Sequence, residues 1–308
     1  MASNAAQRCA MKVILTGSSG RIGRAIFSSL APAHEVVGVD TRAFSTTRIV
    51  ADCGDEAVMR PLLEGADAVI HTGGPHAPHV GVVPDKEFTQ TNVDATAKLY
   101  AWASEAGTTA FLYTSTTALY GHAISPGQCT WLDEETVPLP KTIYHRTKLA
   151  AEKLLEAHAA PHLPVRVLRM SRCFPESAPQ MATYRLHRGI DARDVGEAHL
   201  LALHRAHHGP AFARFVISGA TPFRREDCEA LSHHAPAVIR ERAPKLAEAF
   251  EARRWTLPST IDRIYDPGRA MRDLGWKTRW GWEEVLAQTD RHDLEVLPTG
   301  APVIAKAE

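Results

Sequence analysis

The sequence predicts an α/β fold in which a Rossmann-type, doubly wound parallel sheet carries a smaller, mostly helical lobe. Short β-branched runs alternate with helical patterns from residue 11 to residue 219, and such alternation is typical of parallel sheets. A glycine-rich turn directly follows the first of these runs. Beyond about residue 224 the patterns are helical, without strong strands between them. With 308 residues and 44% hydrophobic content, the chain is long enough to bury such a core.

The first half of the chain provides one round of alternating elements. Strands are expected at 11–16, 35–40, 66–73 and 109–115, and the helical patterns between them include 21–31 and 88–106. Alternation of this kind implies right-handed crossovers, which place helices on both faces of the sheet.

A second round follows residue 140. A helix is expected from Ile143 to His158, and after it a strand at 165–170, a helix at 195–207 and a strand at 213–219. We therefore expect a Rossmann domain at 11–173, rejoined by 191–219, and a substrate-binding lobe made of a loop at 174–190 together with 220–294. Residues 295–308 are expected to form a loose tail.

Composition indicates a small-molecule partner. Basic and acidic residues both number 35, so the charge balance favours neither nucleic acid nor an anionic membrane. The five cysteines are widely separated and form no CxxC pair, which is typical of reduced thiols. No segment has the length and apolar character of a signal peptide or a membrane span, so a cytoplasmic location is expected.

Histidine is abundant, with 16 residues, several of them in clusters. Because the clusters lack carboxylate or cysteine partners at ligand spacing, we expect no metal site. His76 and His79 stand apart, since they follow a predicted strand at the carboxyl edge of the sheet, where His76 is a candidate for contact with substrate.

The turn TGSSGRIG predicts a dinucleotide site. It follows a strand and opens a helix, so the free amides and positive dipole end of that helix would face phosphates. Asp40 ends the second strand, where a carboxylate can accept hydrogen bonds from the ribose hydroxyls of NAD and would repel the 2′-phosphate of NADP. Arg42 could partly reverse that preference, and Asp52 either reaches the adenine or serves as a turn residue. The turn residues expected at the cofactor are Gly17, Ser19, Gly20, Arg21, Ile22 and Gly23.

The segment YHRTK predicts acid and base chemistry. Tyr144 and Lys148 lie four residues apart on one face of a predicted helix, where an ammonium would lower the pKa of the phenol. A tyrosine tuned in this way can exchange a proton with a substrate hydroxyl or carbonyl. The strand FLYTSTTALYG ends in four consecutive hydroxyl residues at the carboxyl edge of the sheet. Together with the dinucleotide site, these residues indicate hydride transfer.

Several motifs in order resemble the extended short-chain dehydrogenase/reductase superfamily, the NAD-dependent epimerase/dehydratase family. They are TGSSGRIG, Asp40, TNVDAT, YTSTTALYG, YHRTK and YDPGRAMRDLGW, which span about residues 11 to 290. The resemblance implies that Thr116, or Ser115 beside it, hydrogen-bonds the reacting oxygen. It further implies that Lys148 holds the nicotinamide ribose and that Asn92 positions the active-site backbone, although an Asn at this point can also be a helix cap.

The sequence departs from the family around the substrate. HTGGP stands where the family more often has two alanines, and Gly73 and Gly74 remain candidates for the cofactor loop. The segment after LRM is short, which favours a smaller substrate than a nucleotide sugar. Part of it is similar to uronate dehydrogenases, and this likeness implies that Arg185 meets a substrate carboxylate. Arg169 and Arg172 are further candidates for substrate contact, with structural ion pairs as the alternative.

These features predict an NAD-dependent oxidoreductase that acts on a secondary alcohol or hemiacetal of a sugar, a sugar acid or a similar small polar molecule. A nucleotide-sugar epimerase or dehydratase with tightly bound NAD is the alternative, and a non-catalytic NAD(P)-sensing regulator is a second one. The family resemblance also implies a homodimer formed by two helices whose apolar residues are Leu99, Tyr100, Trp102, Leu149, Leu154 and Leu155.

Overall fold

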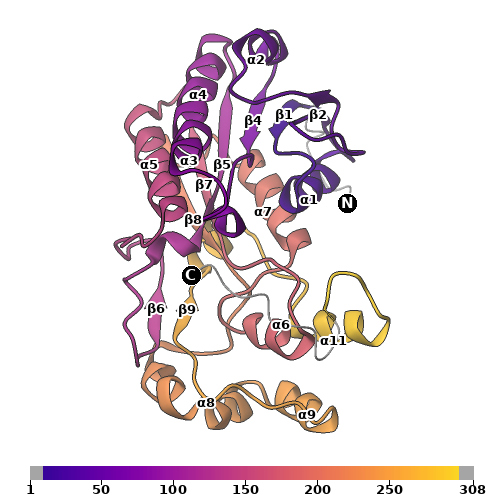
Figure 1. Ribbon diagram of the computed structural model, residues 1–308, viewed down its shortest axis with the longest axis vertical. Helices are drawn as coiled ribbons and strands as arrows, with labels where there is room; N and C mark the ends of the chain where they lie inside the picture. Colours follow the sequence, from indigo (N-terminus) through magenta and orange to yellow (C-terminus); the bar gives the residue numbers. More distant parts are fainter. Residues whose placement is uncertain (1–9, 298–308) are drawn as a thin grey trace, which may run out of the picture.

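The computed structural model describes residues 10–297 and confirms the predicted Rossmann-type fold (Figure 1). Seven strands form one parallel sheet in the order β3-β2-β1-β4-β5-β7-β8. Their bounds are β1 Lys12–Thr16, β2 Glu35–Asp40, β3 Ile49–Val50, β4 Ala68–His71, β5 Ala110–Thr116, β7 Val165–Met170 and β8 Phe212–Ile217. The order reverses between β1 and β4, so a crevice opens there at the carboxyl edge of the sheet.

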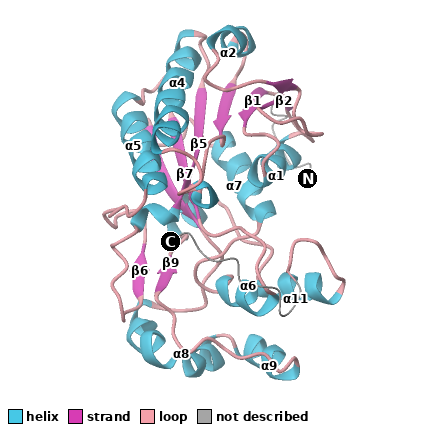
Figure 2. Cartoon of the chain, in the orientation of Figure 1, coloured by secondary structure: helices cyan, strands magenta, loops and turns pink. Residues whose placement is uncertain are grey.

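Helices cover both faces of this sheet (Figure 2). One face carries α1 Arg21–Leu30 and α7 Ala192–His204, which pack together over a core that includes Leu15, Leu112 and Val195. The other face carries α2 Glu56–Leu63, α4 Ala95–Glu105 and α5 Ile143–His158. Helix α5 has the predicted bounds, because Thr142 caps its first turn by accepting a hydrogen bond from the His145 amide at 3.3 Å.

Other predicted helices are present with changed detail. The pattern at 88–106 is a helix in three parts, α3 Asp85–Thr89, a π-helical turn η2 Gln90–Asp94, and α4. Short 3₁₀ turns are found at η1 Ala77–His79, η3 Thr117–Tyr120 and η4 Arg225–Asp227. The helix predicted at 195–207 begins earlier, at Ala192, since the Asp191 side chain caps it by accepting a hydrogen bond from the Arg193 amide.

The smaller lobe is mostly helical and has its own core. It contains α6 Ala178–Tyr184, α8 Cys228–Arg242, α9 Pro244–Ala252 and α11 Trp282–Asp290. Helix α8 is kinked at His234, two residues before Pro236. The segment 174–190, predicted as a loop, thus includes a helix, because Ala178, Met181 and Ala182 are buried in the lobe core.

Two short segments cross the predicted division between the Rossmann part and the lobe. Strand β6 Thr130–Leu132, predicted within the Rossmann part, pairs with β9 Arg263–Tyr265 of the lobe in a separate parallel sheet (Figure 1). Conversely, the segment around α10 Gly268–Asp273, predicted within the lobe, packs on the main sheet through Leu274 and Trp276. Both segments are too short for sequence patterning to show which core they join.

The start of the predicted loose tail is in fact ordered. Leu297 donates its amide hydrogen to the Glu176 carbonyl at 2.9 Å, Val296 is buried, and Glu295 forms an ion pair with Arg21. Residues 298–308, the rest of that prediction, lie outside the described residues.

The apolar residues assigned to a dimer contact are mainly core residues of this chain. Leu99, Tyr100, Trp102 and Leu155 are buried against the sheet, whereas Leu149 and Leu154 are half-buried. The homodimer therefore stays a prediction.

Trp276 closes the core under α7, which leads to a test of its contribution to stability. Its side chain is fully buried and its indole donates to the Asp194 carbonyl at 3.0 Å. We expect Trp276→Ala to lower the free energy of unfolding by about 3 to 5 kcal/mol, because it opens a cavity and removes a hydrogen bond. Urea unfolding measures this change. Leu294→Ala, at a side chain 95% exposed, is the control. An equal, small loss in both variants would contradict the assigned packing.

Candidate active site

The glycine turn packs backbone against backbone. Gly17 has φ +73°, and a Cβ there would lie 2.6 Å from the Gly73 nitrogen. A Cβ at Gly23 would lie 2.0 Å from the Gly17 carbonyl oxygen, so neither position can carry a side chain. Gly20 begins α1 without a side-chain cap, and the amide of Arg24 bonds back to the Gly20 carbonyl at 2.9 Å. The first-turn amides ahead of Arg24 are thus oriented towards the crevice, which suits an anionic ligand.

Asp40 lies beside this turn at the end of β2. Its carboxylate accepts hydrogen bonds from the Ser19 amide at 3.1 Å and the Arg42 amide at 3.0 Å. These two bonds fix the carboxylate at the edge of the turn and leave lone pairs for further donors. The arrangement fits the ribose hydroxyls of a dinucleotide.

Asp52 makes a local turn. Its Oδ1 accepts a hydrogen bond from the Gly54 amide at 2.7 Å, while Asp55 caps α2. Of the two predicted roles, the contacts support the turn residue.

The side chain of Arg21 contacts Glu295, outside the predicted cofactor site. Its guanidinium forms an ion pair with Glu295, so Arg21 contributes to the crevice through its backbone in the first turn of α1. Ile22 packs its side chain against the core under α1.

Tyr144, Lys148 and Thr116 come together at the carboxyl end of β5. The exposed fractions of these residues are 8%, 5% and 9%. The Thr116 side chain lies close enough to the Tyr144 phenol to act on its pKa, in the lowering direction. Burial raises the pKa of Tyr144 to about 12, and the Thr116 side chain offsets this rise only in part, so the predicted lowering by Lys148 is not found.

Lys148 is held under Tyr144 by the backbone of the strand. Its Nζ donates to the Thr114 carbonyl at 2.9 Å and lies 4.5 Å from the centre of the Tyr113 ring. Burial lowers the pKa of Lys148 to about 8, an effect that the charge of Glu152 partly offsets. A lysine with such a pKa can respond to small changes of charge in the crevice.

Ser115, the alternative to Thr116, is occupied elsewhere. It donates to Glu152 Oε1 at 2.5 Å, and Arg169 Nη2 lies 2.6 Å from Glu152 Oε2 in the same buried cluster. Arg169 is therefore a structural ion-pair residue, as the alternative reading of the sequence proposed. Sequence reasoning missed Glu152, although its place four residues after Lys148 on the same helix face could have indicated it.

Asn92 links three segments around the site. Its Nδ2 donates to the Pro75 carbonyl and to the Thr147 hydroxyl, both at 3.1 Å, from inside the π-helical turn. It is therefore not a helix cap. Asn92 Oδ1 would lie 2.2 Å from a Cβ at Gly74, so only glycine fits there. Gly73 and Gly74 both belong to the HTGGP segment. Gly73 packs against Gly17 of the glycine turn, and Gly74 packs against Asn92.

His71 is a further buried group that the sequence did not reveal. It bridges the hydroxyls of Thr16 at 2.6 Å and Thr96 at 3.0 Å, beneath the glycine turn. Burial lowers the pKa of His71 to about 3, so it is a neutral link between β1, β4 and α4.

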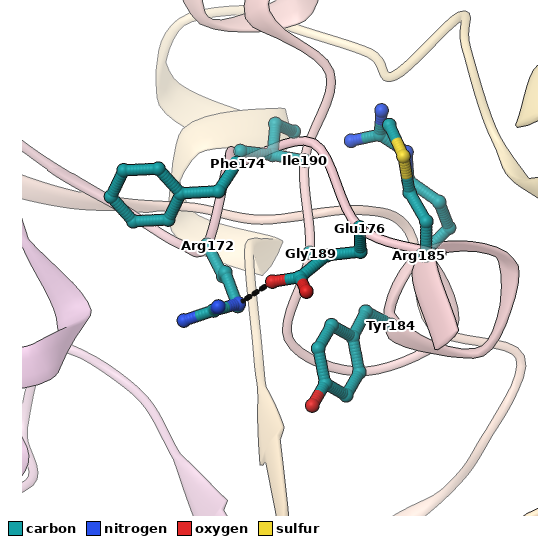
Figure 3. Close-up of a pocket in the computed structure, with 8 residues that line it drawn as sticks. Arg172, Phe174, Glu176, Tyr184, Arg185, Gly189 and Ile190 are labelled. Carbon is teal, nitrogen blue, oxygen red and sulfur yellow. Dashed lines mark hydrogen bonds and ion pairs between the residues drawn. The ribbon is translucent and has the colours of Figure 1, made fainter. Parts of the chain in front are cut away.

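His76 and Arg172 meet at Phe174, on the side of the crevice facing the lobe. The His76 ring stacks on the Phe174 ring with 6.1 Å between centroids. Arg172 forms an ion pair with Glu176, drawn in Figure 3, and lies 5.3 Å from the centre of the Phe174 ring. The small cavity beside them has a volume of about 10 Å³, which is room for one water molecule.

Arg185 is paired with a carboxylate of this chain. It is 4% exposed and its Nη2 lies 3.1 Å from Asp191 Oδ2, so its charge is already compensated by a carboxylate of the chain. A larger cavity of about 590 Å³ lies on the other side of Arg185, between the segment after β8 and the starts of α9 and α11. Among the predicted site residues, only Arg185 lines it.

Residues 10–297 contain neither a metal-type cluster nor a helix that could span a membrane. These residues contain no group of three or more histidine, cysteine or acidic side chains arranged to hold a metal ion. Within the same range, no helix combines the length and apolar character needed to cross a membrane.

A parallel sheet with an uncapped glycine turn and an acidic residue at the end of β2 defines a Rossmann-type dinucleotide-binding protein. The chain belongs to the NAD dependent epimerase/dehydratase family, whose model matches residues 13–188. The family resemblance drawn from the motifs is thereby confirmed.

Individual relatives differ in activity. The chain is 28% identical to an NAD-dependent glucose-6-phosphate dehydrogenase of Haloferax volcanii over 46% of this chain and 60% of that protein. It is 23% identical to a mouse dTDP-D-glucose 4,6-dehydratase over 91% of this chain and 88% of that protein. The chain spans 49% to 60% of the lengths of the first curated relatives that it matches.

Solved structures share the fold. A short-chain dehydrogenase/reductase superfamily protein of Agrobacterium tumefaciens, crystallised with bound NAD, superposes with a TM-score of 0.64 at 20% identity. The match covers 90% of this chain and 95% of that one.

The position of Asp40 predicts the choice of cofactor. A 2′-phosphate beside this carboxylate would bring two anions together, so we expect NAD to be favoured over NADP by roughly 30-fold to 1000-fold in kcat/KM, or about 2 to 4 kcal/mol. Asp40→Ala should erode this preference mainly by weakening NAD binding. Titration of each variant with NAD and NADP measures it.

Asp52→Ala is the matched control for Asp40→Ala, since it also removes a carboxylate that accepts a hydrogen bond from a nearby backbone amide. It should leave the preference unchanged. Equal affinity of the unmodified protein for NAD and NADP would show that Asp40 does not face the ribose.

Proposed function

We propose that this protein is an NAD-dependent oxidoreductase, which transfers hydride between NAD and a secondary alcohol or hemiacetal of a sugar, sugar acid or similar small polar molecule. The placement of Tyr144 and Lys148 one turn apart on α5, with Thr116 at the end of β5 near the phenol, carries the proposal. Family membership supports it, because the family is NAD dependent.

The residues around the glycine turn fit the cofactor. Gly17, Gly23 and Gly74 lack room for a side chain, so the backbone can approach a pyrophosphate closely. The α1 amides would hold the phosphates and Asp40 the adenosine ribose, while Lys148 would hold the nicotinamide ribose. Bound NAD would supply the hydride acceptor or donor.

Tyr144 is the proposed proton carrier. With a pKa of about 12 its phenol is protonated at neutral pH, which suits donation of a proton to a substrate carbonyl oxygen. In the oxidative direction the same oxygen takes the hydroxyl proton, and the nearby Lys148 ammonium favours the phenolate that this requires. Thr116 orients the reacting oxygen through its hydroxyl.

The segment between β7 and α7 supports a small substrate. It contains one seven-residue helix, α6, which leaves little chain to enclose a nucleotide diphosphate. The cavity beside Arg172 and Tyr184 holds about 10 Å³, so either class of substrate would require this segment to move. Because Arg185 is already paired with the buried Asp191, we do not propose it as the residue that binds a substrate carboxylate. His76 and Arg172 are the proposed substrate contacts.

A nucleotide-sugar epimerase or dehydratase is the second candidate. The similarity to the mouse dehydratase supports it, since that match extends over 91% of this chain and includes the lobe. Such an enzyme would use the same Tyr144, Lys148 and Thr116, with NAD reduced and reoxidised within one cycle.

Tyr144→Phe tests the proton carrier. We expect turnover to fall by at least about 100-fold, the usual effect of removing a positioned acid or base, while NAD affinity stays nearly unchanged. Steady-state kinetics and NAD titration measure the two quantities. Tyr100→Phe is the matched control, because its hydroxyl is bonded to the His158 carbonyl, at the opposite end of α5 from Tyr144. Near-normal turnover of Tyr144→Phe would exclude the assignment.

Absorbance of NADH separates the candidate activities. With excess substrate from a panel of sugars, sugar acids and nucleotide sugars, a net oxidoreductase accumulates NADH in proportion to substrate. An epimerase or dehydratase shows no more than one equivalent per site. NAD binding without turnover across the whole panel would favour an NAD(P)-sensing regulator instead.

A further inference from the structure

The larger cavity, beside the lobe helices α9 and α11, is separate from the candidate active site. Its volume of about 590 Å³ is in the range of small-molecule sites. Tyr144, Lys148 and Thr116 do not line it, so it serves no step of the proposed reaction. The charged and aromatic residues that line it are Arg185, Arg242, Lys245, Arg279, Trp280, Trp282 and Glu283.

One wall of the cavity is held in place by a buried carboxylate. Asp194 accepts hydrogen bonds from the amides of Arg279 at 2.9 Å and Trp280 at 3.2 Å. The Arg193 guanidinium lies 4.4 Å from the centre of the Trp280 ring and forms an ion pair with Glu284 of α11 at 3.0 Å. Because these contacts fix both the backbone and the indole, this wall is formed before any ligand binds.

The walls offer flat apolar surface. Trp280 and Trp282 are half-buried and line the cavity just before and at the start of α11. Pro222 and Pro244 line it as well. Indole and proline rings suit a planar ring system, because stacking and apolar burial both use a flat face. The apolar part of a fitting ligand is therefore aromatic.

The balance of charge at the cavity favours an anion. Among the described residues that line it, four are basic and Glu283 alone is acidic. Arg185 is paired with Asp191 at 3.1 Å, although its buried Nε has no hydrogen-bond partner within residues 10–297. Arg242 is paired with Asp227 at 2.8 Å. These two guanidinium groups therefore contribute mainly to the walls.

Two further cations keep charge available to a ligand. Lys245, in the first turn of α9, is exposed and has no ion-pair partner in the part of the chain that the structure describes. Arg279 is 64% exposed and only loosely paired, with its Nη2 3.7 Å from Glu197. The Glu283 carboxylate lies over the start of α11, since its Oε2 would be 2.8 Å from a Cβ at Gly281, and the helix dipole stabilises it there.

We propose that this cavity is a binding site for a planar aromatic carboxylate, independent of the proposed oxidoreductase activity. The ring lies against Trp280 and Trp282. The carboxylate pairs with Lys245, and Arg279 adds positive charge at the same cavity. Arg185 also lines the small cavity on the substrate side, so an occupant contacts the segment that borders the proposed substrate contacts.

Isothermal titration calorimetry of the full chain with 2-naphthoate tests the proposal without reference to catalysis. Excess NAD is present throughout, to keep the probe out of the dinucleotide site. We expect one site per chain with a Kd of roughly 10 to 100 µM, in keeping with a ligand of this size. The neutral 2-naphthamide should bind at least about 10-fold more weakly, because it brings no charge to Lys245.

Two variants locate the probe. Trp280→Ala removes a ring face and Lys245→Met removes a cation, and each should weaken binding of 2-naphthoate at least about 10-fold. Because Lys245 is exposed, its variant keeps the fold even if Trp280→Ala does not. Lys277→Met is the matched control, at an exposed lysine that does not line the cavity, and should leave the Kd unchanged.

Three results would overturn the proposal. They are the absence of saturable binding of 2-naphthoate at millimolar concentration, equal affinity for 2-naphthamide, and an unchanged Kd in Lys245→Met.

Discussion

The buried charge of Glu152 is the constraint on which the candidate site depends. This carboxylate is 1% exposed, and it is satisfied by the hydroxyl of Ser115 on β5 and the guanidinium of Arg169 on β7. A buried charge that loses its partner is strongly destabilising, so α5 cannot shift along the sheet without a large cost in free energy. The same helix carries Tyr144 and Lys148. Their positions relative to Thr116 are thus fixed by the packing of α5 on the sheet.

The glycine turn and α5, the helix that carries Tyr144, are linked by a chain of contacts made mostly by glycine backbone. Gly17 abuts Gly73, Gly74 abuts Asn92, and Asn92 reaches Thr147 on α5. The place for the pyrophosphate and the place for proton exchange are therefore parts of one connected backbone arrangement. The π-helical turn supplies the local widening that brings Asn92 between them.

Much of the fold could be predicted from the sequence, because the alternation of strands and helices repeats along the chain. Alternating strands and helices, the glycine spacing and the capped start of α5 are local patterns. They located the sheet, and they placed Asp40 at the end of β2 and Tyr144 and Lys148 on α5. What could not be predicted depends on partners distant in sequence. Glu152 is paired with Arg169 on β7, and the raised pKa of Tyr144 follows from burial. Three-residue strands such as β6 and β9 carry too little pattern to be recognised before their pairing is known.

The return of Trp276 to the main sheet has a consequence for how the chain acquires its structure during synthesis. The core that begins with Val13 and Leu15 on β1 is completed by Leu274 and Trp276, more than 250 residues later. A nascent chain leaving the ribosome would hold β1, α1 and α7 with an apolar gap until this late segment emerges. Contacts of such sequence separation slow folding, because a long loop must close before they form. The protein therefore depends on its last elements to finish the layer that its first elements start, and shortening the chain before residue 276 would expose that layer.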